Sequence, residues 1–224
     1  MDLGLDQTAR TFLEKGSWWV DCAQSRRYIR AMSKDLTMVA VSAKRFTTDE
    51  FHRLGELGFF DDGPVELIRG ELIEMSPKRT PHSVCNTRLV RRLILLLGEQ
   101  ATVRGQEPIT LSNHSEPSPD VVVAKYREDD YLEGHPGATD CWVVMEISDS
   151  TLKYDRSTKL SLYAESRVLV YWIFNLVNQQ LEVYREPYED SQGEYGYRQK
   201  AIYLATERVE LPIGGWLELD GVFP

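Results

Sequence analysis

The sequence predicts a layered α/β or α+β fold in which helices flank a mixed central sheet. Three uninterrupted apolar runs, at residues 121–124, 142–145 and 168–174, indicate strands covered on both faces. Segments with helical periodicity alternate with these runs along the chain, which is the order expected of helices packed on a sheet with some parallel pairing.

The length and composition suit one medium-sized domain. The chain has 224 residues, and its hydrophobic fraction of 42% is enough to fill a core. Residues 1–43 mix charges and aromatics without sustained periodicity, so we expect an N-terminal appendage before a domain at residues 44–224. No apolar run reaches the roughly 18 residues of a membrane helix, and no secretory signal opens the chain. We therefore expect a cytoplasmic protein without a membrane partner.

The first elements of the domain have clear local signals. Thr47 and Thr48 supply an N-cap before an acidic first turn, and apolar residues at helical spacing follow as far as Gly58. Residues 64–77 contain two short apolar segments on either side of Arg69-Gly70, which predicts a tight hairpin.

The longest predicted helix spans residues 80–100. One arc is apolar and the opposite arc is basic; the apolar members are Leu89, Leu93, Leu96 and Leu97, and the basic ones are Arg88, Arg91 and Arg92. His82 and Asn86 project onto the same stripe as the first leucines, so the stripe that should face the sheet begins with polar residues. A helix that enters a polar cleft would show this pattern.

Strand-like runs make up most of the remaining chain, at residues 103–112, 119–126, 141–148, 168–174 and 179–186. A helix is expected between the third and fourth of them, at residues 155–166, and an exposed hairpin tip at residues 189–197. The three cysteines, Cys22, Cys85 and Cys141, form no C-x-x-C pair, and we expect reduced thiols that serve packing.

The charge is distributed unevenly. The net charge of -9 argues against a protein whose whole surface coats nucleic acid. Residues 75–106, however, contain six Lys and Arg residues against Glu99 alone, which gives this segment +5. The arginines at positions 88, 91 and 92 could therefore contact DNA, although a solvated helix face is an equally simple explanation.

Three polar elements stand at the ends of the best strands. Asp120 precedes the run at 121–124, Glu146 follows four apolar residues of a buried strand, and Asp155, Lys159 and Tyr163 share one stripe of the next helix. Of the helix residues, we expect Asp155 to be an N-cap and Tyr163 to serve packing.

Buried carboxylates are unfavourable unless they are paired or bind a cation. Two carboxylates and water suit magnesium or manganese, and a neighbouring lysine can stabilise charge that develops on phosphorus. A structural ion pair between Glu146 and Lys159 is the simpler alternative. The joint occurrence of Asp120, Glu146 and Lys159 favours an active site.

The order of these residues resembles the PD-(D/E)XK nuclease signature, through Pro119-Asp120 and Glu146-Ile147-Ser148, but Ser148 stands where that signature has lysine. From about Arg45 to Phe223 the chain resembles the Uma-two family, which is widespread in cyanobacteria. The segments that carry the resemblance are FTTDEF, VELIRGELIEMSP, PSPDVVV, VVMEISDST, DRSTKLSLYAES and VYWIFN, in that order. In such proteins the lysine has moved to the following helix, where Lys159 stands here.

This resemblance implies a restriction-endonuclease-like core and a Mg- or Mn-dependent endonuclease that cuts DNA, with a homodimer as a possible assembly. Asp120 and Glu146 would be metal ligands, the Ile147 carbonyl a further one, and Lys159 the catalytic lysine. Glu71 matches the additional N-terminal carboxylate of the superfamily, with Glu66 and Glu74 as competitors for that role.

The sequence adds one further candidate residue and one alternative hypothesis. His82 joins the candidate catalytic residues because of its place on the inward stripe of its helix. The replacement of the usual lysine by Ser148 and the acidic net charge leave a second hypothesis, a nuclease-fold protein that binds nucleic acid or a protein partner without cutting it.

Overall fold

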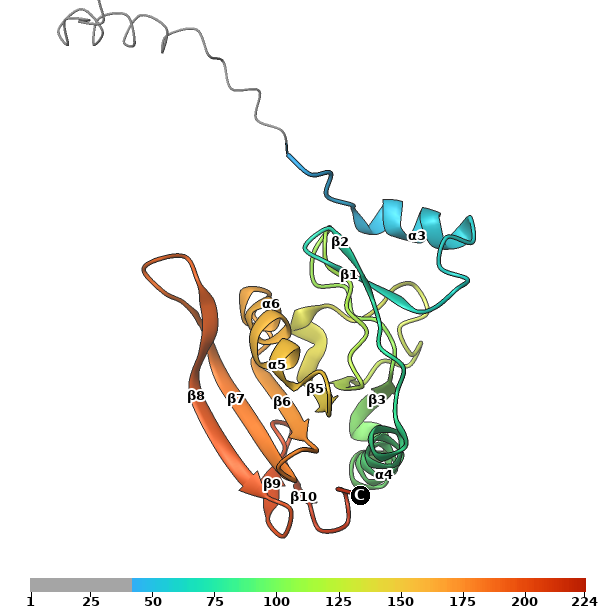
Figure 1. Cartoon of the computed structure of the whole chain (residues 1–224). Coiled ribbons are helices and arrows are strands. Elements are labelled where there is room, and N and C mark those ends of the chain that lie inside the picture. The colour runs from blue at the N-terminus through green and yellow to red at the C-terminus, as the bar shows by residue number, and fades with distance from the viewer. Residues whose placement is uncertain (1–41) are drawn as a thin grey trace, which may run out of the picture. The chain divides into compact units, whose positions relative to one another are not determined.

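A six-stranded mixed sheet forms the centre of the structure, a computed structural model that describes residues 42–224 (Figure 1). The strands follow the order β3-β4-β5-β6-β7-β8 across the sheet. Their bounds are β3 Ala101–Gly105, β4 Val121–Lys125, β5 Cys141–Ser148, β6 Val170–Asn175, β7 Gln180–Glu189 and β8 Tyr195–Leu204. Strands β5 and β6 pair in parallel, and the other neighbouring strands pair antiparallel. The predicted mixed sheet is confirmed.

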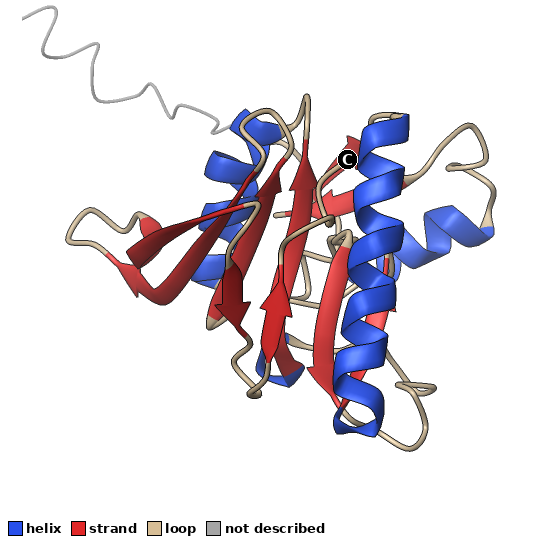
Figure 2. Cartoon of the chain, turned by 90° about the horizontal axis from the view of Figure 1, so that it is seen from below, coloured by secondary structure: helices blue, strands red, loops and turns tan. Residues whose placement is uncertain are grey.

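Helices cover both faces of this sheet. Side chains of β4 alternate between two apolar clusters, with Val121 and Val123 on one face and Val122 and Ala124 on the other. The first face packs against α4 (Thr80–Leu97), which Figure 2 shows lying along the sheet, and against the small β9–β10 sheet (Arg208–Glu210 and Trp216–Glu218). The second face packs against one helical segment, made of α5 (Leu152–Tyr154), the π-helical turn η3 (Asp155–Lys159) and α6 (Leu160–Glu165).

The N-terminal elements form as their sequence signals predict. Helix α3 (Thr48–Glu56) begins with a capping box, in which Thr47 accepts from the Glu50 N–H and Glu50 accepts from the Thr47 N–H. Strands β1 (Val65–Ile68) and β2 (Glu71–Glu74) form the hairpin around Arg69-Gly70, whose φ values of 50° and 78° fit a tight hairpin turn.

A backbone contact ties this hairpin to the loop that precedes β4. Leu67 and Glu116 exchange N–H···O bonds of 3.4 and 2.8 Å. The side chain of Glu66, one residue before Leu67 on β1, is therefore held beside the start of β4.

Two expectations about α4 need adjustment. Leu89, Leu93 and Leu97 are buried as predicted, but Leu96 is 37% exposed, so its assignment to the apolar arc is wrong. The helix ends at Leu97 because Gly98 adopts a φ of 50°, and residues 98–100 continue as the short 3-10 turn η1 (Gly98–Gln100).

The strand expected at residues 103–112 is also shorter than predicted. Strand β3 stops at Gly105, because Gln106 has a φ of 60° and Pro108 cannot donate a backbone hydrogen bond to a ladder. The hairpin tip between β7 and β8 is exposed, as predicted.

Several remaining expectations concern the whole chain. Cys85 and Cys141 are buried free thiols, as expected, and Cys22 lies outside the described residues. The appendage expected at residues 1–43 also lies outside them, except for its last two residues. Within residues 42–224, no helix has the length and apolar character needed to cross a membrane.

Replacing Gly70 should test the hairpin turn that carries Glu66. A Cβ at this position would lie 2.7 Å from Arg45 Cβ, and the φ of 78° disfavours any L side chain. We expect Gly70→Ala to lower the free energy of unfolding by about 1–3 kcal/mol in urea denaturation. Gly63→Ala is the matched control, since a Cβ there meets nothing within 4 Å. Equal losses in both variants would contradict the assigned turn.

Candidate active site

Strands β4 and β5 bring Asp120 and Glu146 together. The strands run antiparallel with Val121 opposite Met145, so the start of β4 lies beside the end of β5. The Asp120 N–H donates to Glu146 Oε2 at 3.3 Å, and the Ile147 N–H donates to Asp120 Oδ2 at 2.9 Å. Both carboxylates are buried. The sequence prediction that these two acids meet agrees with this geometry.

The helical segment after β5 supplies a buried cation to the same place. Lys159 Nζ lies 3.3 Å from Glu146 Oε1, and Tyr163 donates its hydroxyl hydrogen to that oxygen at 2.7 Å. Tyr163 is fully buried, so it packs as predicted and also fixes Glu146. The sequence missed this second role because a tyrosine on an apolar stripe looks like core.

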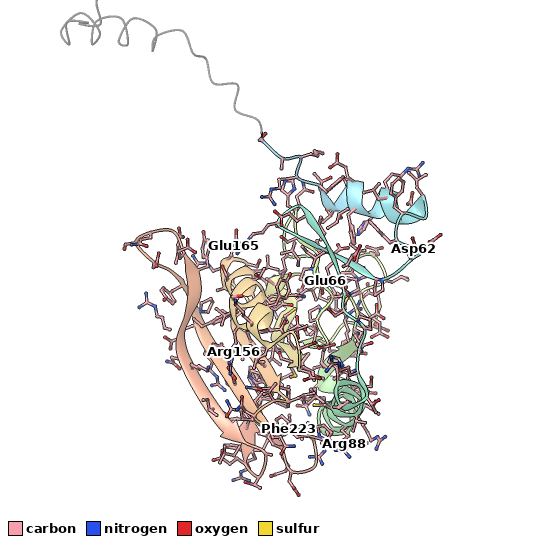
Figure 3. All side chains as sticks on the ribbon, viewed as in Figure 1. Asp62, Glu66, Arg88, Arg156, Glu165 and Phe223 are labelled. Carbon is pink, nitrogen blue, oxygen red and sulfur yellow. The ribbon has the colours of Figure 1, made fainter. Side chains whose placement is uncertain are left out.

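The third acid of the site is Glu66 rather than Glu71. Glu66 Oε1 accepts from Lys159 Nζ at 2.7 Å and from the Ser118 N–H at 3.1 Å, and Figure 3 shows Glu66 within the body of the domain. Glu71, which the sequence favoured, has a side chain that is 60% exposed and pairs with Arg45 at the hairpin turn. The selection of Glu71 is therefore wrong. Glu74 is exposed and lines the cavity, and it forms no ion pair within residues 42–224.

His82 reaches the site from the first turn of α4. Its Nε2 lies 2.9 Å from Asp120 Oδ2, as the polar start of the helix stripe suggested. Lys78, just before α4, places Nζ 3.9 Å from Asp120 Oδ1, and Arg79 lies 3.9 Å from Asp149. These two basic residues belong to the basic segment noted in the sequence, but no local pattern assigned them to the site.

A cavity of about 370 Å³ opens at this cluster. The side chains that line it and belong to the network above are Glu66, Lys78, His82, Asp120, Glu146 and Lys159. The cavity is therefore acidic at its base, where Glu66 and Glu146 hold Lys159, and basic where Lys78 and Arg79 stand. This arrangement suits a ligand that carries phosphate together with a cation.

Asp155 does not cap the helix, contrary to the sequence expectation. The helical segment already begins at Leu152, and Asp155 opens its π-helical turn. The Asp155 carboxylate is buried, and its Oδ2 accepts from Ser148 Oγ and from Thr151 Oγ1, both at 2.7 Å. Ser148, which replaces the lysine of the signature, is thus bonded to the helix that carries Lys159.

Burial controls the electrostatics of the site. Burial raises the pKa of Glu146 to about 8; the Lys159 charge opposes this shift, and the neighbouring acids Asp120, Asp155 and Glu66 add to it. For Lys159, burial would lower the pKa, but Glu146 and Glu66 outweigh it and hold the pKa above its ordinary value. Lys159 is therefore protonated at neutral pH.

The donor chemistry of the cluster fits a hard divalent cation. Four buried carboxyl groups, those of Glu66, Asp120, Glu146 and Asp155, stand around one buried ammonium, so the cluster holds more acids than the one cation can compensate. Carboxylate oxygens are the ligands that magnesium and manganese prefer. Within residues 42–224, no three Asp, Glu, His or Cys side chains form a ready-made ligand group, since Lys159 lies between Glu66 and Glu146.

Two of the three arginines proposed to bind DNA have other partners. Arg88 donates to the carbonyl of Phe223 at 2.7 Å, next to which it appears in Figure 3, and Arg92 donates to the carbonyl of Glu218 at 2.7 Å. These bonds fasten the C-terminal segment to α4. DNA binding by this arc stays a prediction, and Arg91 is its exposed member.

Comparisons with known proteins identify relatives of this architecture. The model of the Uma2 family, described as "Putative restriction endonuclease", matches residues 48–219. A crystal structure described as a putative nuclease belonging to DUF820 from Anabaena variabilis aligns with a TM-score of 0.59 and 17% identity, and the alignment covers 80% of this chain and 97% of that one. At this identity the likeness shows a shared fold. No curated protein matches the chain.

The raised pKa of Glu146 predicts how stability responds to pH. The folded state holds this proton up to about pH 8, whereas an unfolded glutamate releases it near pH 4.5. Without divalent cations, the free energy of unfolding should therefore fall as pH rises from 5 to 8, by up to about 1 kcal/mol per pH unit. Glu146→Gln should remove this part of the slope in urea titrations at several pH values. An identical slope in Glu146→Gln and the wild type would refute the assignment.

Proposed function

The chain belongs to the Uma2 family, described as putative restriction endonucleases, and from this premise we propose a metal-dependent endonuclease that hydrolyses phosphodiester bonds of DNA. The observation that carries the proposal is the position of Lys159, whose Nζ lies 2.7 Å from Glu66 and 3.3 Å from Glu146. A buried ammonium beside strand-end carboxylates can stabilise charge on a phosphoryl group. Magnesium or manganese is the proposed cofactor, in keeping with the general use of divalent ions by restriction-endonuclease-like families.

In this mechanism each side chain has a defined task. Asp120 and Glu146 would hold the cation, with the Ile147 carbonyl as a predicted further ligand. A bound cation supplies Lewis-acid stabilisation and lowers the pKa of a coordinated water. Lys159 would donate hydrogen bonds to the phosphoryl oxygens as negative charge builds on them, and Glu66 would aim its ammonium.

Further residues orient the carboxylates that would hold the cation. Tyr163 holds Glu146 through its hydroxyl, and His82 holds Asp120 at 2.9 Å. Lys78 and Arg79 stand where the cavity opens, at the N-terminus of α4, and are proposed to bind phosphates that flank the cleaved bond. The acidic surface elsewhere would then leave this basic rim as the main contact with DNA.

The alternative of a nuclease-fold protein that binds without cutting rested on Ser148 and on the acidic net charge of the chain. Lys159 supplies the ammonium that the signature expects at position 148, which favours the enzyme. The homodimer suggested by the family resemblance stays a prediction of the sequence.

Metal binding and cleavage should depend on Asp120. Manganese should raise the melting temperature of the wild type more than that of Asp120→Ala, since an ion that binds only the folded state stabilises it. The same variant should lose cleavage of a DNA substrate by roughly 100-fold or more. Glu71→Gln is the matched control, because this exposed acid on the hairpin should retain both properties. Lys159→Ala should lose cleavage yet keep the manganese shift. Cleavage that survives in Asp120→Ala would overturn the proposal.

The basic rim should contribute to DNA binding through charge. The double variant Lys78→Ala, Arg79→Ala should weaken binding, and the slope of log K against log salt should become shallower by about one to two units. Fluorescence anisotropy without divalent cations measures this while the DNA stays intact. The double variant Arg198→Ala, Arg208→Ala removes the same charge from β8 and β9 and should leave the slope unchanged. A separate Arg91→Ala variant tests whether the basic arc of α4 also contacts DNA.

A further inference from the structure

Ser148 occupies a position that the proposed function does not use. It is the last residue of β5, two residues after Glu146, and it is fully buried. Its hydroxyl donates to Asp155 Oδ2 at 2.7 Å, and Thr151 donates to the same oxygen at 2.7 Å. The end of the strand and the start of the helical segment are thus joined through one carboxylate oxygen.

The backbone of Asp155 is held as well. The hydroxyl of Tyr171, on the parallel neighbour β6, donates to the Asp155 carbonyl at 3.2 Å. Strands β5 and β6 therefore fix the side chain and the main chain of one residue, which is itself 4% exposed.

Asp155 opens the π-helical turn that Lys159 closes. A π turn holds one more residue than an α turn, so it changes the direction in which the following side chains point. Lys159 reaches Glu66 and Glu146 from the end of this turn. The direction of the Lys159 side chain consequently depends on how firmly the start of the turn is held.

Asp155 can accept its two hydroxyl hydrogen bonds without carrying a charge. Burial raises its pKa, with the two hydroxyl donors acting in the opposite direction. No salt bridge of Asp155 occurs within residues 42–224. Both hydroxyls reach the same oxygen, so the bonds need an acceptor there and do not need a negative charge.

We propose that Ser148, Thr151 and Asp155 form a latch that sets the π-helical turn and so places Lys159 in the site. Asp155 also lines the cavity, and in this proposal it is a positioning residue that acts through Lys159. Serine at position 148 thus has two roles. Its short side chain leaves space for the Lys159 ammonium, and its hydroxyl holds the helical segment that carries Lys159. The catalytic consequence rests on the proposed function, whereas the placement of Lys159 does not.

The test compares two substitutions of Asp155 in the full chain. Asp155→Ala removes the acceptor, and Asp155→Asn keeps a carbonyl oxygen that can accept both hydroxyl donors. The first readout is the rate at which acetic anhydride acetylates Lys159, followed by peptide mass spectrometry. We expect at least roughly tenfold faster acetylation in Asp155→Ala, because the turn opens locally, and a rate near that of the wild type in Asp155→Asn.

Two further readouts separate positioning from direct chemistry. In Asp155→Ala, kcat for DNA cleavage should fall by about 10- to 100-fold with little change in KM, and Asp155→Asn should restore it. The rise in melting temperature with manganese should persist in both variants, since Asp120 and Glu146 are intact. Loss of that rise in both would instead make Asp155 a metal ligand and overturn the latch.

Further variants keep the test decisive. Should Asp155→Ala not fold, Ser148→Ala with Thr151→Val removes the donors and should expose Lys159 in the same way. Ser157→Ala is the control within the same turn, because its hydroxyl bonds to the Lys153 carbonyl and not to Asp155. Unchanged Lys159 acetylation after loss of the latch, or equal damage from Asn and Ala, would refute the proposal. A wild type that does not cleave DNA would refute the proposed function, while the acetylation rates would still decide the latch.

Discussion

The ammonium of Lys159 between Glu66 and Glu146 is the interaction on which the rest of the site depends. All three groups are buried, and removing Lys159 would leave two acids without their cation in a medium of low dielectric constant. Each group also comes from a different element, namely β1, β5 and the π-helical turn. The hairpin, the sheet and the helical segment must therefore be assembled correctly before the charges can meet.

A second buried glutamate on the same sheet shows what full compensation looks like. Glu182 on β7 is completely buried, but Arg156, Lys200, Asn175 and Tyr184 all donate to it. Burial raises the pKa of this carboxyl, and the hydrogen bonds outweigh burial and hold the pKa well below its ordinary value. Glu146 has the opposite balance, with a pKa of about 8. The fold is thus able to compensate a buried acid fully, and it leaves Glu146 without such compensation.

Local sequence signals were sufficient to predict those site residues whose direction depends on a single strand or helix. Asp120 and Glu146 followed from buried strand runs, and His82 followed from the projection of one helix. The choice of Glu71 over Glu66 failed because the hairpin is oriented by the bond between Leu67 and Glu116, 49 residues apart in the numbering of the chain. Asp155 looked like an N-cap because its true partner, Ser148, is recognised only once the helix folds back onto β5. Arg88 and Arg92 looked free because their acceptors lie at the C-terminal end.

Under the proposed function, the departure of Ser148 from the nuclease signature is explained by the position of Lys159 on the following helical segment. Lys159 reaches the buried acids from the helical segment, with its ammonium 2.7 Å from Glu66 and 3.3 Å from Glu146, while Ser148 holds that segment through Asp155. Stability alone does not account for four buried carboxyl groups around one lysine, because an apolar cluster of similar volume is often at least as stable. Under the proposed function, a cation and a phosphate would compensate these charges, and those are the two components that phosphodiester hydrolysis brings together.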